Sequence, residues 1–395
     1  MKLNREIVIV DGARTPYGKF GGGLKNFSAT DLGVLAARAA LERAKVAPDQ
    51  VDHVLFGNVL QTSADAIYLA RHVGLKADVP KEVPALTVNR LCGSGFEAVV
   101  QGAMRILLGE AEVCLVGGTE SMSQAAHVIR GARWGLPLGS APMEDQLWAS
   151  LTDSYCDRAM AITAETLAER NGVNRADSDA LALQSQQRAT DAIGAGRLAH
   201  EIVPVEVPSR KGTKVIDADE HPRAEATAEA LAGLRPYFSK EGVVTAGNAS
   251  GICDGAVALV LASRERADAL GLRPLGRLVS WGTAGVDPEI MGIGPVPASR
   301  QALERAGLSI DAMDLVEINE AFAAQAVVCE RELGVDRAKL NVNGGAVALG
   351  HPLGSTGARL ALTALKELGR RGGRYGLVTM CIGGGQGISG VIERI

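Results

Sequence analysis

The sequence of 395 residues lacks the features that would assign it to several classes of protein. No apolar run approaches the roughly 18 residues that a transmembrane helix needs, so no integral membrane association is expected. The formal net charge of -4 provides no field that would attract nucleic acid or an anionic membrane. Residues 1–5 run directly into the strand-like segment 6–10, which leaves no room for a signal peptide. We therefore expect a cytoplasmic protein, of a bacterial cytosol or a mitochondrial matrix.

Cysteine is scarce, and its spacing excludes two kinds of site. The six cysteines are far apart and form no CxxC pair, which fits neither a disulfide framework nor a zinc pattern. We expect six free thiols, no metal and no permanently bound cofactor. The chain also has no GxxxxGKS/T loop for phosphates. A match to GxGxxG at 385–390 is followed by only five residues, so no helix can follow it to bind a dinucleotide.

What the sequence does contain is an internal repeat. Residues 38–54 and 300–316 are identical at nine of seventeen positions when they are aligned without gaps. Each copy reads as a helix, a turn and the start of a strand. Residues 112–117 and 374–380 add a second match, because each reads as a buried strand after a helical stretch. Two matches in the same order indicate the duplication of one α/β unit.

The region between the two copies has a different character. It contains tryptophans and prolines, a helical run near 162–187 and a polar stretch at 209–223. Because residues 255–262 read as another buried strand, this region is predicted to be an insertion into the first half. The predicted fold class is α/β with two duplicated halves: a first half of 1–120 and 250–272, an inserted loop domain of 121–249, and a second half of 273–395. One large irregular α/β domain is the alternative.

Cys92 lies in the most informative segment, NRLCGSGF at 89–96. A helical stretch follows, with a buried face predicted at Val99, Met104, Ile106 and Leu107. Cys92 is therefore expected at a strand-to-helix turn, where free N–H groups and the helix dipole favour a thiolate. Gly93 and Gly95 would let a substrate approach the backbone closely. The alternative is a buried structural cysteine.

Three other segments carry candidate chemistry. His351 lies between the glycine-rich turns of NVNGGAVALGHPLGSTG at 341–357, so it is expected to project into a cleft and, with an ordinary pKa of about 6.5, to accept a thiol proton. Cys381, in MCIGGGQG, is a candidate second acid/base, and backbone N–H groups near Gly383 could bind an oxyanion. Asn319, in EINEAF, could form a turn, orient a histidine or hold a water.

Together these four segments resemble the thiolase family, and the resemblance covers essentially the whole chain. Cys92 in NRLCGSG, Asn319 in NEAF, His351 in GGAVALGHPLGSTG and Cys381 in CIGGGQG match the family's catalytic positions in the same order. The resemblance implies two duplicated α/β halves in five αβαβα layers, with a loop domain in the first half. It also implies a homo-oligomer, a dimer or a tetramer, to which residues 130–138 would contribute.

The resemblance also implies a mechanism. His351 would activate Cys92, which attacks the keto carbonyl of a 3-ketoacyl-CoA. Cleavage of the carbon–carbon bond would release acetyl-CoA and leave an acyl group on Cys92. Cys381 would protonate the departing carbanion and then deprotonate coenzyme A, the co-substrate. Asn319, through a water, and His351 resemble one oxyanion hole, and the N–H groups of Cys92 and Gly383 resemble the other.

The residues that would bind CoA are also implied by the resemblance. They are Leu151, Met160, Arg223, Ala246, Ser250 and Phe322. Arg223 would stack on the adenine, and Ser250 would meet the pantetheine. Arg210, Lys211 and Lys214 would supply local positive charge, although a solvated hairpin explains them equally well.

One departure from the family's pattern bears on the substrate. Short-chain thiolases that form acetoacetyl-CoA typically have His-Met-Gly where this chain has Ala-Met-Ala at 159–161. At this place, and at residues 150–153 and 65–75, the sequence resembles mitochondrial-type 3-ketoacyl-CoA thiolase. We therefore expect thiolysis in fatty acid β-oxidation. The alternatives are an acetyl-CoA acetyltransferase that works in the condensation direction and a non-enzymatic acyl-CoA-binding subunit. A ketosynthase-like enzyme would pair its cysteine with two histidines, which Cys381 argues against.

Overall fold

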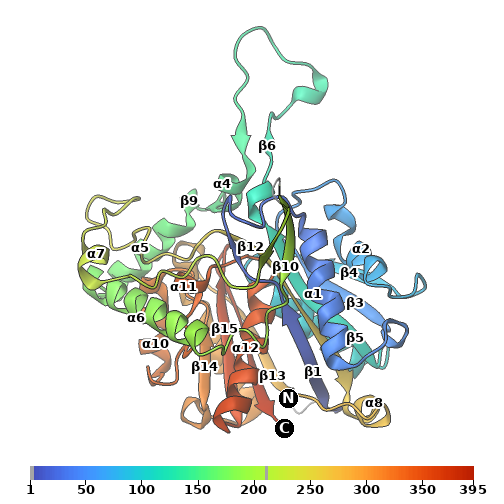
Figure 1. Ribbon diagram of the computed structural model, residues 1–395. Coiled ribbons are helices and arrows are strands. Elements are labelled where there is room, and N and C mark those ends of the chain that lie inside the picture. The colour runs from blue at the N-terminus through green and yellow to red at the C-terminus, as the bar shows by residue number, and fades with distance from the viewer. Residues whose placement is uncertain (1–3, 210–211) are drawn as a thin grey trace.

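The computed structural model describes residues 4–209 and 212–395, and its central feature is a mixed sheet built from both halves of the chain (Figure 1). The first half contributes β4 (Ala85–Val88), β3 (His53–Gly57), β5 (Val113–Ser121), β12 (Cys253–Ser263) and β1 (Ile7–Arg14), in that spatial order, and the short β2 (Gly18–Lys19) pairs with β12. The second half continues with β13 (Gly276–Gly285), β16 (Gln386–Arg394), β15 (Tyr375–Ile382) and β14 (Leu315–Ile318). The halves join where residues 7–9 pair with 276–278.

The two halves repeat one order of elements. In the first half, α1 (Ala29–Ala44), α2 (Leu69–Lys76) and α3 (Ser94–Leu107) alternate with the strands. In the second half, α9 (Pro295–Ala306), α10 (Ala323–Leu333) and α12 (Thr356–Arg371) take the corresponding places. Residues 38–54 leave α1 and enter β3 through a short 3₁₀ turn, and 300–316 do the same between α9 and β14. The predicted duplication is confirmed.

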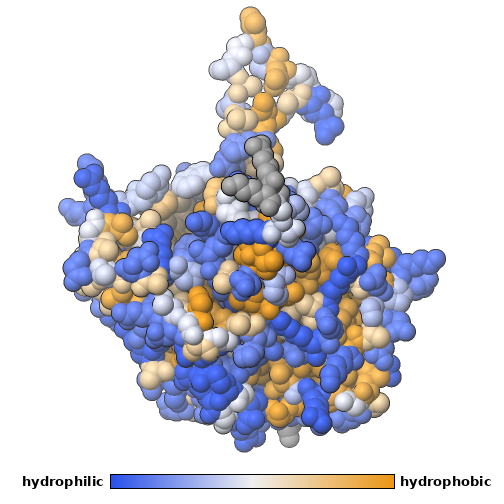
Figure 2. Space-filling model, in the orientation of Figure 1, coloured by the Kyte–Doolittle hydropathy of each residue, from blue (hydrophilic) through white to orange (hydrophobic). Residues whose placement is uncertain are grey.

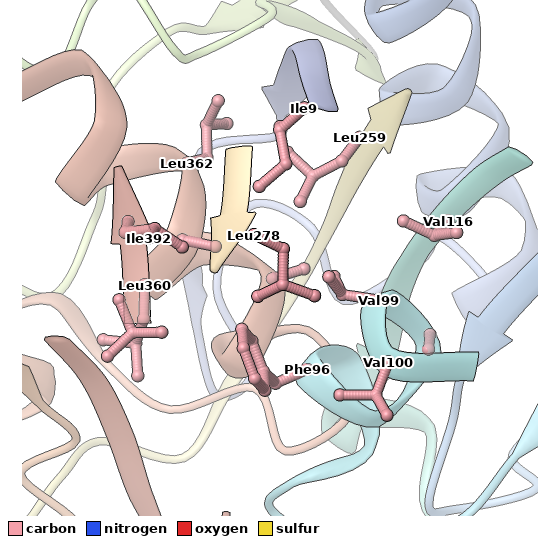
Figure 3. Packing of buried hydrophobic residues seen from close by; sticks show 14 of the residues in the cluster. Ile9, Phe96, Val99, Val100, Val116, Leu259, Leu278, Leu360, Leu362 and Ile392 are labelled. Carbon is pink, nitrogen blue, oxygen red and sulfur yellow. The ribbon is translucent and has the colours of Figure 1, made fainter. Parts of the chain in front are cut away.

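The helices and strands form five layers. α1 covers the outer face of the first half and α9 the outer face of the second, while α3 and α12 pack against each other between the two halves. Figure 3 shows this shared core, in which Phe96 and Val99 of α3 and Leu360 and Leu362 of α12 lie among side chains of both halves. Burial of this central layer on both sides explains why α3 and α12 are so rich in small and apolar residues.

The predicted buried face of α3 is partly wrong. Val99 and Ile106 are buried, but Met104 is 37% exposed and Leu107 is half-buried. With about 3.6 residues per turn, Val99 and Ile106 lie on one face, whereas Met104 is displaced from it by about 140°. The inward side is instead continued by small residues such as Ala103.

The segment between β5 and β12 forms the insertion. It contains β6 (His127–Val128), β7 (Glu144–Asp145), α4 (Gln146–Ser150), β8 (Thr152–Asp153), β9 (Arg158–Ala159), α5 (Met160–Arg170), α6 (Arg175–Gly194), β10 (Val205–Ser209), β11 (Gly212–Ile216) and α7 (Ala228–Ala232). The predicted helical run is two helices. Gly172 has a positive φ of 64°, and Asn174 caps a new helix that begins at Arg175, because its side chain accepts from the N–H of Asp177. The exact domain boundaries remain a prediction.

Two features complete the description. The short helix α8 (Arg264–Ala269) follows β12, and the short helix α11 (Ala346–Leu349) precedes α12. Short 3₁₀ turns occur at Pro48–Gln50, Ala66–Tyr68, Met122–Gln124, Ala132–Trp134, Pro288–Ile293 and Ile310–Ala312. Residues 126–145 rise from the body as an extended arm (Figure 1). Over the described part of the chain, no helix combines the length and the apolar character that crossing a membrane requires.

Candidate active site

A cavity of about 380 Å³ lies where the insertion meets both halves. Cys92 and His351, from different halves, both line it. Most of the remaining wall is apolar and includes Met122, Leu147, Trp148, Leu151, Met160, Phe238, Ile252, Met291, Phe322 and Leu353. The cavity can therefore hold a largely apolar molecule against a thiol and an imidazole.

Cys92 lies in the turn between β4 and α3, as predicted. The preceding Leu91 has a positive φ of 46°, and its N–H donates to Asn89 Oδ1 at 2.9 Å, which fixes the turn. The glycines have a different role from the expected one. A Cβ at Gly95 would lie 2.7 Å from the carbonyl oxygen of Gly354, and a Cβ at Gly93 would lie 2.5 Å from Ile382 Cδ1. The absence of a side chain at these two positions lets the second half of the protein pack closely, and does not serve the approach of a substrate.

The surroundings of Cys92 do not stabilise a thiolate on their own. The backbone N–H groups of Gly383 and of Cys92 itself donate toward the sulfur and lower its pKa. Burial raises the pKa more, and the negative charge of Glu120 adds to it, so that the pKa of Cys92 is raised to about 11. The expected thiolate preference is therefore wrong: at neutral pH Cys92 is a thiol that needs a base. The two N–H groups are those that the resemblance assigned to an oxyanion hole.

His351 projects into the cavity, as expected, although its side chain is only 5% exposed. Its Nδ1 lies 2.7 Å from Thr356 Oγ1, and that hydroxyl donates to the Pro352 carbonyl at 3.0 Å. Because the hydroxyl proton is used by Pro352, we infer that Nδ1 carries a proton and donates to Thr356. Nε2 is then left with a free lone pair. Burial, together with the charge of Arg359, lowers the pKa of His351 to about 3, so the ring is neutral at pH 7.

Asn319 follows β14 and contacts the same imidazole. Its Nδ2 lies 3.3 Å from His351 Nε2, so the amide can donate to that lone pair. The side chain is fully buried, and Oδ1 has no partner among the protein groups that the structure describes. Of the three roles that the sequence left open, contact with a histidine is therefore observed. The free Oδ1 could also accept from a water.

Cys381 lies at the end of β15 behind the wall of the cavity. It is fully buried and packs with Met291 and Ala321, next to Met160 and Phe322. Burial raises its pKa well above the ordinary value, and the proximity of Cys92 raises it further. Cys92 therefore acts electrostatically on Cys381, although the two thiols come from different halves.

The six predicted CoA residues fall into two groups. Leu151, Met160, Ser250 and Phe322 line the cavity that contains Cys92. Arg223 and Ala246 line a second cavity of about 170 Å³, together with His221 and Leu231. The segment 246–250 lines both cavities, one at each of its ends. The N–H of Ser250 holds this segment in place by donating to the Ala321 carbonyl at 3.0 Å. Lys214 lies exposed on β11, whereas Arg210 and Lys211 are outside the described residues.

Sequence reasoning missed several residues of this region. Glu120 is fully buried and accepts from Asn58 Nδ2 and from the N–H groups of Val59, Leu60 and Gly354, while burial raises its pKa to about 7. Trp148 and Phe238 stack with ring centroids 6.2 Å apart. Thr356 was within a motif but had no assigned role. Glu120 and the stacked rings are identified only by contacts between distant segments, whereas Thr356 is identified by its local contact with His351.

Comparisons with known proteins agree with this geometry. Residues 7–265 match the family "Thiolase, N-terminal domain" and residues 272–394 match "Thiolase, C-terminal domain". The chain is 54% identical to human mitochondrial 3-ketoacyl-CoA thiolase over 394 residues, which cover 100% of this chain and 99% of the relative. The crystal structure of the human enzyme in complex with CoA has a TM-score of 0.98 and 53% identity, covering 100% and 99% of the two chains.

A second kind of thiolase is also similar. The crystal structure of Bacillus anthracis acetyl-CoA acetyltransferase has a TM-score of 0.97 and 44% identity, and the match covers 100% of both chains. The predicted thiolase fold and the resemblance on which it rested are confirmed. The two matched domains together cover almost the whole sequence, and the chain belongs to the thiolase family.

Proposed function

We propose that this protein is a 3-ketoacyl-CoA thiolase, an acyltransferase that cleaves 3-ketoacyl-CoA with CoA to acetyl-CoA and a shortened acyl-CoA. The observation that carries the proposal is the arrangement around Cys92. Its sulfur accepts from two backbone N–H groups, and it shares an apolar cavity with a neutral histidine whose Nε2 carries no proton and can take one. The 54% identity to the human enzyme of that name supports the substrate class.

The first step is the attack of Cys92 on the keto carbonyl. Nε2 of His351 takes the thiol proton, while Thr356 holds Nδ1–H and thereby fixes the orientation of the ring. Burial disfavours both the thiolate and the imidazolium, so the proton moves as the sulfur–carbon bond forms rather than before it. The charge that develops on the substrate oxygen is received by the N–H groups of Cys92 and Gly383. Each such donor is worth about 3–4 kcal/mol of barrier.

Carbon–carbon cleavage then leaves an acyl group on Cys92 and a carbanion on acetyl-CoA. His351, now protonated at Nε2, and a water held by Asn319 stabilise the enolate oxygen of this leaving group. Cys381 gives its proton to the carbanion and becomes a thiolate. In the second half-reaction, that thiolate takes the proton of CoA, whose sulfur displaces Cys92 from the acyl group. Cys92 recovers its proton from His351.

The two cavities suggest a path for CoA. The thioester end would lie along Leu151, Met160 and Ser250 in the cavity of Cys92, and the nucleotide would lie by Arg223 and Ala246. The similar human structure contains CoA, which supports CoA as the co-substrate here. The apolar lining and the small Ala159 beside the site favour an acyl chain longer than acetyl.

An oligomer and a compartment are also part of the proposal. The arm at 126–145 exposes a row of apolar side chains, to which Ile129, Trp134, Leu136, Leu138 and Met143 belong. Figure 2 shows hydrophobic residues gathered along it. Apolar side chains this exposed are usually covered by a partner, so we propose a homotetramer assembled from dimers through the arms. We also propose a cytoplasmic location.

The test is CoA-dependent thiolysis of acetoacetyl-CoA, 3-keto-octanoyl-CoA and 3-ketopalmitoyl-CoA, with Cys92→Ala as the control. Faster cleavage of the longer esters, lost in the variant, is the expected result. Activity confined to acetoacetyl-CoA would favour an acetyl-CoA acetyltransferase, the alternative supported by the similarity to the Bacillus anthracis enzyme. Binding of CoA without turnover of any ester would favour the non-enzymatic subunit.

A further inference from the structure

A buried carboxyl group joins the two halves of the molecule. Glu120 lies on β5, is fully buried and is not among the residues that line the active-site cavity. Its Oε1 accepts from Asn58 Nδ2 and from the N–H of Leu60, both at 3.0 Å. Its Oε2 accepts from the N–H of Val59 at 3.1 Å and from the N–H of Gly354 at 2.9 Å. Three donors therefore belong to the segment 58–60 after β3, in the first half, and the fourth belongs to the second half.

The segment 58–60 is bonded to the turn that carries Cys92. The carbonyl of Val59 accepts from Asn89 Nδ2 at 3.3 Å, and Asn89 Oδ1 accepts from the N–H of Leu91 at 2.9 Å. Leu60 and Cys92 also pack against one apolar cluster, whose buried members are Met122, Leu147 and Leu353. A displacement of this segment would therefore move the sulfur of Cys92.

The fourth donor leads to His351. Gly354 lies in the turn before α12, where the Pro352 carbonyl accepts from Thr356 Oγ1 at 3.0 Å and the same Oγ1 lies 2.7 Å from His351 Nδ1. Only glycine fits at 354, because a Cβ there would lie 2.7 Å from the Thr119 carbonyl oxygen and 3.0 Å from Glu120 Oε2. The carboxyl group therefore holds the turn on which the orientation of the imidazole depends.

The arrangement of the donors explains why a carboxyl group occupies this place. Four N–H donors converge on two oxygens, and a side chain with one acceptor or none would leave buried N–H groups unpaired. Oε2 accepts from both halves, so the bonds fix the two segments relative to each other rather than within one half.

We propose that Glu120 is a positioning residue that sets the separation between Cys92 Sγ and His351 Nε2. The transfer of the thiol proton requires these two atoms to lie within hydrogen-bond reach, and a misplacement of about 1 Å can cost about a hundredfold in rate. Because Glu120 does not line the cavity, its effect is on the chemical step and not on the binding of the ester. This inference rests on the proposed role of His351 as the base.

The test is Glu120→Gln, which keeps the shape of the side chain. Its NH2 group can only donate and replaces an oxygen that accepts two bonds, whereas a protonated carboxyl would keep both oxygens as acceptors. We expect kcat for thiolysis to fall about 10- to 100-fold while KM changes less than about twofold. The matched control is Glu367→Gln. It changes another buried carboxyl group, whose partners Asn343, Arg370 and Arg371 all belong to the second half, and it should retain wild-type kcat.

The His351→Ala background separates positioning from a general structural role. If Glu120 acts by placing the imidazole against the sulfur, Glu120→Gln should change kcat by less than about twofold once the imidazole is absent, because the effects of residues that act as a unit are not additive. An equal loss in both backgrounds, or a wild-type kcat in the single variant, would overturn the proposal.

A crystal structure tests the inference without turnover. In Glu120→Gln, the separation between Cys92 Sγ and His351 Nε2 should differ from the wild-type value by about 0.5–1 Å, and an unchanged separation would overturn the proposal. Failure of the thiolase assay and failure of this inference are therefore distinguishable. If Glu120→Gln does not fold, Asn89→Ala, which alters an exposed side chain bonded to the same segment, takes its place in both measurements with the same expected and contrary results.

Discussion

The two halves of the molecule share one order of elements but bring different side chains to the cavity. The turn before α3 carries Cys92, whereas the turn before α12 carries His351. The gap-free alignment of the repeat places Gly57, at the end of β3, opposite Asn319, after β14. A Cβ at Gly57 would lie 2.6 Å from the backbone of Ser94, so the first half can accommodate only glycine where the second half has an amide.

This difference explains how a duplicated fold can hold an asymmetric site. The first half provides Cys92, the proposed nucleophile, and one N–H group, and the second half provides the imidazole, the amide, a second thiol and the N–H of Gly383. Neither half contains a complete site. The tight packing of Gly95 against Gly354 brings the two sets together. The predictions below test this division, from the largest expected effect to the smallest.

Removing the nucleophile of the first half should have the largest effect. Cys92→Ala should lower kcat for thiolysis by a factor on the order of 10⁵–10⁶, because no other group at the site can carry the acyl chain. The matched control is Cys156→Ala, which changes a thiol that does not line the cavity and should retain wild-type activity. Comparable losses in both variants would contradict the assignment of Cys92.

Removing the base of the second half should change the pH dependence as well as the rate. His351→Ala should lower kcat/KM at pH 7 by about 10²–10⁴-fold. With the pKa of Cys92 at about 11 and that of His351 at about 3, the neutral pair prevails between these values, so the wild-type rate should stay flat from pH 6 to 9. The variant depends on the thiolate and should gain about tenfold per pH unit. A wild-type rate that falls below pH 6.5 would show that His351 titrates normally.

The paired positions of the repeat should respond in opposite ways. Asn319→Ala should lower kcat by about 10²–10³-fold, as the loss of one oxyanion-hole donor does, with a small change in thermal stability. Gly57→Ala should instead destabilise the fold by about 1–3 kcal/mol, because the added methyl meets the backbone of Ser94. Thermal melting and kcat would be measured for each. If Asn319→Ala lowered thermal stability without a specific loss of kcat, the two positions would not differ in role and the comparison would be contradicted.

The insertion should affect binding rather than chemistry. Trp148→Ala removes a ring that lines the cavity and stacks on Phe238, and it should raise KM for long 3-ketoacyl-CoA esters several-fold while kcat changes little. Trp134→Ala is the control, because that ring is 87% exposed on the arm. It should leave KM unchanged and weaken the oligomer. A fall in kcat for Trp148→Ala would indicate that the insertion contributes to the chemical step as well as to binding.

Much of this account could be predicted from the sequence, because the informative signals are local. The repeat predicted the duplication, and the glycine-rich segments identified the residues at 92, 319, 351 and 381. Burial could not be read in the same way. The start of a helix suggested a thiolate at Cys92, and the glycine-rich turns suggested a His351 of ordinary pKa, but burial shifts both pKa values so that the neutral forms are favoured. Glu120 accepts from groups far apart in sequence, such as the N–H of Gly354, so its place at the site could not be read locally.

The most direct test of the central claim is to trap the acyl-enzyme. The wild-type protein would be mixed with 3-keto-octanoyl-CoA in the absence of free CoA, quenched with acid and digested for mass spectrometry. We predict a hexanoyl group on Cys92 and the release of an equal amount of acetyl-CoA. Release of acetyl-CoA with no acyl group on Cys92, or with the group on another cysteine, would contradict the account.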